Sequence, residues 1–160
     1  MIISNTTPIS NFLQLERFDL LKRLFPVLHI SQAVKREIDV VFAAHRVWQT
    51  SLQDDFIVVH EVASSDLRRH FLSVLHPGEA EALCLYLEQH ADLCLVDDRD
   101  ARAIATLHHI KLTGTLGILI QAKQRGVIDI VHPLLNRLRE EHIFWISAEM
   151  YDTVLHLTGE

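Results

Sequence analysis

Short apolar runs alternate with longer amphipathic stretches along this chain. Apolar runs of this length are typical of strands buried on both faces of a sheet, and they predict strands at residues 2–5, 27–30, 56–59, 92–96 and 111–113. Apolar residues at helical spacing predict helices at residues 8–15, 20–25, 32–42, 64–75, 79–89, 99–108, 116–125, 128–140 and 148–157. Strands that alternate with helices imply right-handed crossovers, so we expect an α/β fold with a central parallel sheet covered on both faces.

Several helix boundaries carry signals of their own. Thr7 is expected to be the N-cap of the first helix, with Pro8 at its first position. Ser31 is expected to cap the third helix. Pro77 and Gly78 separate two helical stretches. These signals place the acidic residues discussed next on particular strand ends and helices.

Three carboxylates follow one of the predicted strands within four positions. Asp97, Asp98 and Asp100 come directly after the apolar run that ends at Val96. In open α/β sheets the ligand crevice lies at the carboxyl ends of the strands, and clustered carboxylates there repel one another unless a divalent cation relieves the repulsion. A plainer interpretation makes this segment a turn in which Asp98 caps the next helix. The segment alone leaves both interpretations open.

Other polar residues stand at comparable places. Asn5 ends the first predicted strand, as Asp97 ends a later one. Glu79 and Glu81 lie where a helix begins after Pro77-Gly78, and Glu37 lies in a helix whose apolar stripe is Ala33, Val34, Ile38, Val41 and Phe42. Each lone Glu can also be a solvated helix residue, or an acid that is favourable near a helix N-terminus. Only their combination with the strand-end residues points to a site.

Taken in order, these segments resemble the PIN-domain nucleases, specifically the toxin-like subgroup known as the DUF3368 family. The matching stretches are residues 3–9, 18–24, 27–37, 78–82, 96–99, 113–117 and 133–140, which span nearly the whole chain. The resemblance implies a PIN-like three-layer α/β/α sandwich with a central parallel sheet of four to five strands. We expect one domain over residues 1–160, a length that suffices for a substantial core.

The resemblance implies a metal-dependent ribonuclease, often the toxin of a toxin–antitoxin pair, whose acidic cluster holds Mg²⁺ or Mn²⁺. Carried over by position, the acidic cluster comprises Asn5, Glu37, Glu79 and Asp97, with Asp98 beside it. PIN domains generally have Asp where this chain has Asn5. Asn offers a carbonyl oxygen without a negative charge, which implies weaker metal binding.

From these residues we expect water to hydrolyse an RNA phosphodiester. Asn5, Glu79 and Asp97 are the expected metal ligands. Glu37 would hold a ligand water or a second ion, and Asp98 would be an alternate ligand. Thr6 would donate a hydrogen bond to a carboxylate or phosphate, and the basic residues considered for phosphate contact are Arg99, Arg102, Lys123 and Arg125. The sequence leaves open the choice between Glu79 and Glu81, and between Asp97 and Asp98, as direct ligands.

Composition and charge limit which partners, metal sites and locations are expected for the chain. The formal net charge of −6 argues against a general nucleic-acid-binding surface. Without the four carboxylates of the site it would be about −2, since each removes one negative charge, and bound cations would offset the rest. The eleven histidines show no zinc-finger spacing, and Cys84 and Cys94 are expected to be buried, reduced thiols. Without a signal or membrane-spanning pattern, a cytoplasmic protein is the expectation.

Two other function classes are alternatives to a nuclease. The first is an inactive PIN scaffold that binds RNA or a protein partner, because Asn5 removes charge from the site. The second is a Mg²⁺-dependent phosphatase, which usually needs a nucleophilic Asp after the first strand or a phosphate-binding Gly loop that this chain lacks. The expected partners are RNA, an antitoxin and a second copy of the chain, contacted through the apolar segment 143–157. Trp48 and Trp145 are expected to be core or interface anchors rather than base-stacking platforms.

Overall fold

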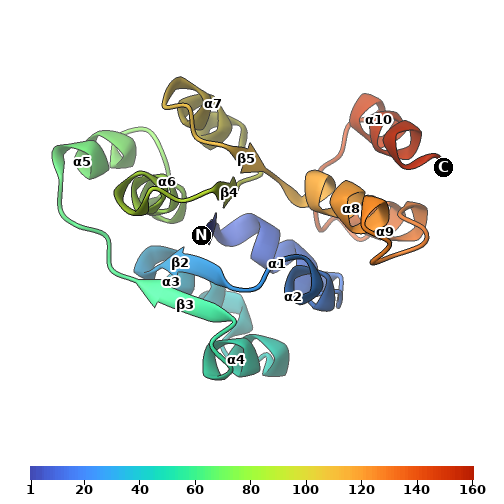
Figure 1. Ribbon diagram of the computed structural model, residues 1–160, viewed down its shortest axis with the longest axis horizontal. Coiled ribbons are helices and arrows are strands. Elements are labelled where there is room, and N and C mark those ends of the chain that lie inside the picture. Colours follow the sequence, from blue (N-terminus) through green and yellow to red (C-terminus); the bar gives the residue numbers. More distant parts are fainter.

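The computed structural model describes residues 1–160 and contains one parallel sheet of five strands (Figure 1). The strands are β1 (Ile2–Ser4), β2 (Leu28–Ser31), β3 (Ile57–His60), β4 (Leu93–Leu95) and β5 (Leu112–Thr113), in the order β3-β2-β1-β4-β5. In the pair β1–β4, Ile2 is aligned with Leu93 and Ser4 with Leu95. The first strand of the chain therefore lies at the centre of the sheet.

Ten helices connect and cover the strands. They are α1 (Thr6–Gln14), α2 (Asp19–Leu24), α3 (Gln32–Phe42), α4 (Arg46–Gln53), α5 (Asp66–Leu72), α6 (Pro77–Gln89), α7 (Arg99–Leu107), α8 (Thr115–Gln124), α9 (His132–Glu140) and α10 (Ala148–Thr158). The expected three-layer α/β/α sandwich with a parallel sheet is confirmed.

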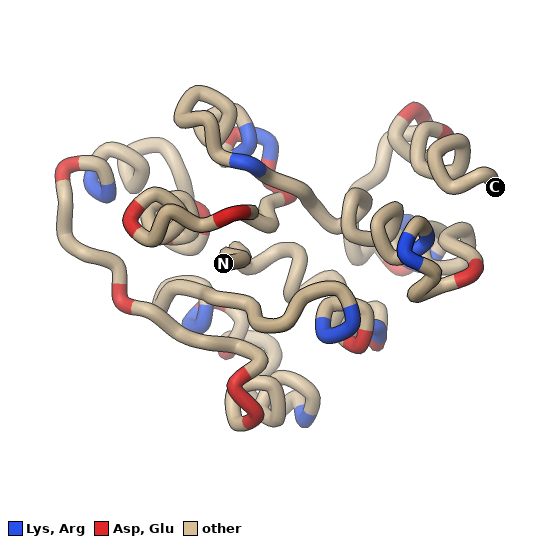
Figure 2. The backbone as a smooth tube through the Cα atoms, in the orientation of Figure 1, with Lys and Arg blue, Asp and Glu red and all other residues tan.

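The core is divided between the two faces of the sheet because side chains alternate along each strand. Leu28, Ile30 and Leu95 pack on one face against α1, α2, α3, α8, α9 and α10. Ile3 and Cys94 pack on the other face against α5, α6 and α7. Figure 2 shows that acidic and basic positions are spread over the outer elements, with both signs where α7 begins.

Most predicted elements are confirmed, with differences at their boundaries. Ser31 caps α3 as expected, since its hydroxyl accepts a hydrogen bond from the Val34 N–H at 3.2 Å. Thr7 is not an N-cap, because α1 already begins at Thr6 and Asn5 occupies the capping position. The sequence patterns did not predict α4, and they extended α5 and α9 too far.

Val41 lies differently from what its pattern predicted, and the two tryptophans differ from each other in burial. Val41 was expected in the buried stripe of α3 but is exposed, whereas its neighbour Phe42 packs against the core and continues the stripe from Ile38. Trp48 is fully buried, as expected, whereas Trp145 is 78% exposed and is not part of the core.

The two cysteines are buried and free, as expected. Burial raises the pKa of the Cys84 thiol to about 11 and that of the Cys94 thiol to about 12. Both thiols therefore stay protonated near neutral pH and are poor nucleophiles. None of the helices combines the length and the apolar character that crossing a bilayer would require.

Candidate active site

The candidate site lies where the strand order changes direction. From the central β1, the chain builds β2 and β3 on one side and β4 and β5 on the other. A crevice forms at the carboxyl ends of the two strands that flank such a switch point. Asn5 follows β1 directly, and its N–H donates to the Leu95 carbonyl of β4 at 3.0 Å. Asp97 follows β4, so parallel pairing brings these two polar residues to the same end of the sheet.

Asn5 is buried, with 1% of its surface exposed, and no protein group donates a hydrogen bond to its side-chain Oδ1. An unpaired oxygen in such a place costs about 1–3 kcal/mol of stability. The carbonyl of a side-chain amide is also an oxygen ligand that hard cations accept. The fold thus keeps one unsatisfied oxygen at the end of its central strand.

Asp97 is held by the start of α8. Its Oδ1 accepts from the Thr115 N–H at 2.7 Å, and its Oδ2 accepts from the Thr115 hydroxyl at 2.6 Å. The buried Asn11 amide donates in turn to the Thr115 hydroxyl oxygen at 2.9 Å. Burial raises the pKa of Asp97, although the hydrogen bonds from Thr115 and the positive charge of Arg102 oppose the shift. The carboxylate is therefore well oriented but incompletely neutralised.

Gly114 makes room for that carboxylate. A Cβ atom at this position would lie 2.4 Å from Asp97 Oδ1 and 3.1 Å from the Val96 carbonyl oxygen. Gly78 does the same for another acid, since its Cβ would lie 2.3 Å from Glu37 Oε2. Both glycines are needed for close approach rather than for an unusual backbone angle.

Glu37 connects three elements instead of pointing into solvent. Its Oε1 accepts from the Gly78 N–H at the start of α6, at 2.7 Å, and its Oε2 accepts from the Thr6 hydroxyl at the start of α1. An anion at a helix N-terminus is favourable because of the helix dipole. Thr6 therefore meets a carboxylate, one of the two partners expected for it, and its hydroxyl proton is already engaged.

Glu79 is half-buried near the start of α6. Its Oε2 accepts from the His76 N–H at 3.1 Å, which confirms that it supports the helix N-terminus. Burial raises the pKa of Glu79, and the nearby negative charge of Asp98 and, more weakly, of Glu37 adds to the effect. These charge interactions place the three carboxylates within electrostatic reach of one another.

Asp98 caps α7, as the plainer interpretation of its segment predicted. Its Oδ1 accepts from the N–H groups of Asp100 and Ala101, at 2.8 and 2.9 Å. The residue also borders the cleft that contains Asp97 and Glu79. The capping interpretation is therefore confirmed, and the turn that starts α7 also faces the cleft.

Glu81 lies apart from this group. It is 4% exposed, accepts from the Ala33 N–H at 3.1 Å and forms an ion pair with Arg68 at 2.6 Å. Burial alone would raise its pKa, but the hydrogen bonds from Arg68 and Ala33 outweigh burial and lower the pKa. Glu81 joins α6 to α3 and α5, which leaves Glu79 as the acid of this segment that faces the cleft.

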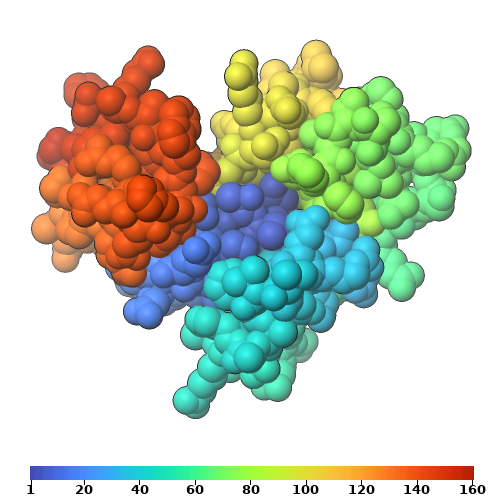
Figure 3. Space-filling view, turned by 180° about the vertical axis from the view of Figure 1, so that it is seen from behind, coloured from blue at the N-terminus to red at the C-terminus, as the bar shows by residue number.

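A cleft of about 560 Å³ brings most of the predicted residues together. Its lining is Thr7, Glu79, Asp97, Asp98, Arg99, Arg102, Phe144, Trp145 and Met150. Figure 3 shows this hollow between the C-terminal segment, orange to red, and the segment near residue 100, yellow, with N-terminal residues, blue, at its base. Arg102 donates from Nη1 to the Val96 carbonyl at 2.9 Å, which holds its guanidinium at the cleft wall.

Two basic residues considered for phosphate contact lie elsewhere. Lys123 pairs with Glu160 at 3.3 Å, and Arg125 donates to the Leu24 carbonyl at 3.4 Å. Both are at the C-terminal end of α8, whereas the N-terminal end of this helix meets Asp97. The prediction of phosphate contacts at the cleft is therefore wrong for Lys123 and Arg125.

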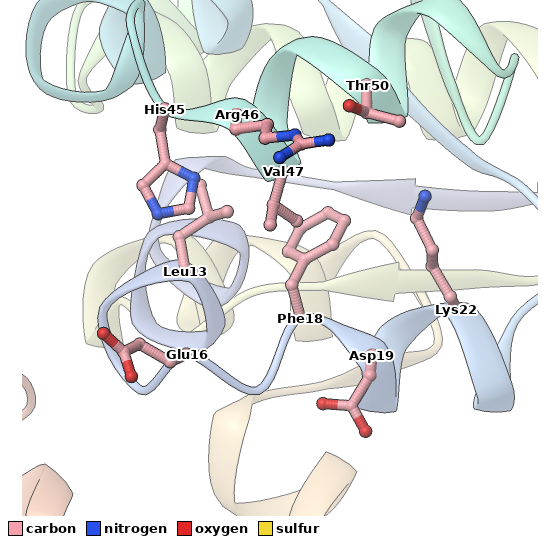
Figure 4. Close-up of a pocket in the computed structure, with 9 residues that line it drawn as sticks. All are labelled: Leu13, Glu16, Phe18, Asp19, Lys22, His45, Arg46, Val47 and Thr50. Carbon is pink, nitrogen blue, oxygen red and sulfur yellow. The ribbon is translucent and has the colours of Figure 1, made fainter.

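A larger hollow, of about 620 Å³, lies between the α1–α2 segment and α4 (Figure 4). Phe18 and Val47 form its apolar wall, and Lys22 at its rim is paired with Asp54 at 2.7 Å. This hollow contains none of the residues that the sequence singled out, and it shares no residue with the acidic cleft. Its size alone does not make it the better candidate for catalysis.

The oxygen atoms at the carboxyl ends of β1 and β4 and at the start of α6 are of the kind that a hard divalent cation such as Mg²⁺ takes as ligands. No three His, Cys, Asp or Glu side chains form a ready-made metal cluster. Mg²⁺, however, usually binds one or two carboxylates and retains several waters. The unpaired Oδ1 of Asn5 and the raised pKa values of Asp97 and Glu79 fit a cation that would complete their environment.

Sequence reasoning missed the residues that orient the carboxylates. Asn11 and Thr115 form the hydrogen-bonded chain that ends at Asp97, and Gly78 and Gly114 provide space. Gly78, Gly114 and Thr115 lie inside stretches that carried the resemblance, but spacing gave them no role. Asn11 carried only one signal, a polar residue among the apolar positions of an amphipathic helix.

Comparison with known proteins identifies a family from the whole chain. The family model DUF3368, described as a PIN domain, matches residues 1–160. No curated protein matches the chain.

Proposed function

The chain belongs to the DUF3368 family of PIN domains, and from this premise we propose that it is a metal-dependent endoribonuclease that hydrolyses phosphodiesters of single-stranded RNA. PIN domains are generally nucleases and generally use divalent metals. The observation that carries the proposal is the buried Asn5 Oδ1, which no protein group satisfies, at the strand end beside that of Asp97. An oxygen of this kind suits a cation that also binds the neighbouring carboxylates.

We assign Asn5, Glu79 and Asp97 to Mg²⁺ or Mn²⁺. When bound, such an ion polarises a phosphoryl oxygen and lowers the pKa of a coordinated water. Thr115 orients Asp97 through two hydrogen bonds, so that this carboxylate is positioned before the ion arrives. Asp98 uses one oxygen to cap α7 and keeps the other for a water or an alternate contact.

Glu37 is proposed to position Glu79. It ties the N-terminus of α6 to α1 through Gly78 and Thr6, and this contact sets the direction of Glu79 one residue further along. Arg99 and Arg102 border the same cleft and are proposed to contact RNA phosphates. Their positive charges offset the local carboxylates, whose repulsion would otherwise keep a polyanion out.

We propose the toxin of a toxin–antitoxin pair, acting on RNA in the cytoplasm, as the biological role; the PIN-domain family of the chain supports the nuclease part of this proposal. The proposed partners are an antitoxin and a second copy of the chain, and Met150 and Leu157 on α10 offer exposed apolar surface for either. A catalytically weak scaffold that binds RNA or protein is the alternative, favoured by the missing charge at Asn5 and by the absence of a ready-made metal cluster. A cleavage assay separates the two.

The assay combines purified protein with a panel of end-labelled single-stranded RNAs, in Mn²⁺, in Mg²⁺ and in EDTA. We expect internal cleavage with either metal and none in EDTA. An Asp97→Ala preparation, purified in parallel, controls for contaminating ribonucleases. Equal cleavage by both preparations, or no cleavage of any RNA with millimolar metal, would refute the nuclease proposal and favour the scaffold.

Asn5→Asp is expected to tighten metal binding. The substitution adds a negative charge next to Asp97 without changing side-chain size, and an anion binds a hard cation more strongly than an amide does. Isothermal titration with Mn²⁺ should give a lower Kd for the variant. Asn136→Asp is the matched control because it makes the same exchange on α9, outside the cleft, where Oδ1 already accepts from the Tyr151 hydroxyl. An unchanged Kd for Asn5→Asp would remove Asn5 from the metal ligands.

A further inference from the structure

Trp145 stands at the mouth of the acidic cleft with most of its ring uncovered. It is 78% exposed, although it lines the cleft together with Asp97 and Arg102. The other tryptophan, Trp48, is fully buried and donates from Nε1 to Asp39 at 2.8 Å. Exposing a large aromatic side chain forgoes about 1.5–3 kcal/mol of burial free energy. The position of Trp145 therefore calls for a reason other than folding.

The segment between α9 and α10 presents this ring outward. On one side of Trp145, the Phe144 N–H donates to the Leu138 carbonyl at 3.0 Å, and the Phe144 side chain packs against the core. On the other side, Ile146 is buried, with 6% of its surface exposed. The neighbours on both sides are thus anchored, and the backbone between them directs the indole away from the core and toward the cleft mouth.

The cleft supplies what an unpaired nucleotide requires. Arg99 and Arg102 offer positive charge for a phosphate, and the carboxylates of Glu79, Asp97 and Asp98 line the same cleft. An exposed indole offers a flat surface on which any nucleobase can stack. Bases inside a duplex have both faces covered by their neighbours, so only a single strand can place a base on this ring.

We propose that Trp145 is the base-stacking residue of this cleft and selects single-stranded RNA by binding an unpaired nucleobase next to the phosphate that is cleaved. The inference rests on the proposed function for the identity of the strand, but the stacking itself requires no cleavage. Stacking on Trp145 would select single strands whatever the identity of the base.

Binding is tested with the emission of Trp145 as the readout. A single-stranded RNA of seven nucleotides is titrated into wild-type protein in EDTA and into Asp97→Asn protein in Mn²⁺, both at low salt. An abasic strand with the same number of phosphates is titrated in parallel. Stacking should quench the tryptophan emission with the RNA and leave it unchanged with the abasic strand, because only a base can cover the ring.

Variants separate stacking from charge. Because the Trp145 variants lack this emission, binding by all variants is measured by the fluorescence anisotropy of an end-labelled RNA. Trp145→Leu should weaken RNA binding roughly 5- to 150-fold, the effect expected for loss of one stacked base. Trp145→Phe should retain most of the affinity because it keeps an aromatic face. Leu107→Ala is the matched control, since Leu107 is also 78% exposed but does not line the cleft, and its binding should equal that of wild type.

The possible outcomes are distinct. Equal quenching by the abasic strand, unchanged RNA affinity of Trp145→Leu, or no binding of either strand would overturn the inference and assign the exposed ring to a protein partner. RNA cleavage in Mn²⁺ is measured separately on the same preparations. Base-dependent quenching without cleavage would leave the stacking role intact and refute the nuclease proposal. If Trp145→Leu cleaves RNA as wild type does and quenching does not depend on a base, the stacking role is refuted and the nuclease proposal stands.

Discussion

Asp97→Asn is expected to abolish RNA cleavage and, in the same protein, to make the metal-free form harder to unfold. The rate should fall at least about 100-fold, since removing even an indirect partner of a metal ligand costs 10- to 100-fold. Stability should change in the opposite direction because burial raises the pKa of Asp97, so its ionised form is disfavoured in the folded protein at neutral pH. A neutral amide of the same shape removes that penalty and keeps an acceptor for the Thr115 N–H.

Two measurements on wild type and variant check this expectation. Melting curves in EDTA should give a higher Tm for Asp97→Asn, by roughly 2–4 °C for each kcal/mol gained. Addition of Mn²⁺ should raise the Tm of wild type, because a ligand that binds only the folded state stabilises it, and should raise that of the variant much less. Asp100→Asn, at an exposed position on α7, is the control. A variant that loses stability in EDTA and responds normally to Mn²⁺ would rule out Asp97 as a metal ligand.

Gly114→Ala is expected to be nearly as damaging to cleavage as the loss of Asp97 itself. The added methyl group would lie 2.4 Å from Asp97 Oδ1, so the carboxylate must move. A small shift of residue 114 cannot relieve this clash, because the added Cβ would also lie 3.1 Å from the carbonyl oxygen of Val96, a backbone atom. Overpacking of this kind costs about 1–3 kcal/mol of stability, and a displacement of about 1 Å at a reacting centre can cost about 100-fold in rate.

Gly126→Ala controls for the loss of stability. Gly126 has a φ of +66°, so alanine is strained there, by about 1–2 kcal/mol, but no atom lies within 4 Å of the added Cβ. Unfolding by urea should thus give similar losses for the two variants, whereas only Gly114→Ala should lose cleavage. Gly78→Ala, which displaces Glu37, should resemble Gly114→Ala. Full activity of Gly114→Ala at a temperature where it is folded would contradict the role of this contact.

The sequence predicted the sheet well because short apolar runs indicate both that its strands are buried and where they end. β1 and β4 were placed within about a residue of their observed ends, and Asn5 and Asp97 therefore fell at the same edge. It failed for α4, which is only eight residues long and has just three apolar residues, Val47, Trp48 and Leu52, of which Trp48 alone is fully buried.

The cleft was harder to predict than the sheet because its contacts join distant parts of the chain. Periodicity cannot reveal that Thr115 binds Asp97, or that a glycine at the start of α6 leaves room for an acid on α3. Glu79 and Glu81 look alike in the sequence, yet one faces the cleft and the other binds Arg68. Residues that are two positions apart on a helix point about 200° apart around its axis. The packing of α6 against its neighbours then gives Glu79 and Glu81 their separate roles.

The position of β1 at the centre of the sheet matters during protein synthesis. The ribosome releases β1 first, but one edge of this strand stays unpaired until β4, aligned through Ile2 and Leu93, has emerged. Asp97 is then still unrestrained, because its anchor Thr115 follows later in the chain. The cleft consequently stays incomplete until most of the chain has emerged, because Phe144, Trp145 and Met150, which also line it, come later still. Late completion of the central sheet thus delays the assembly of the proposed active site until most of the chain has been made.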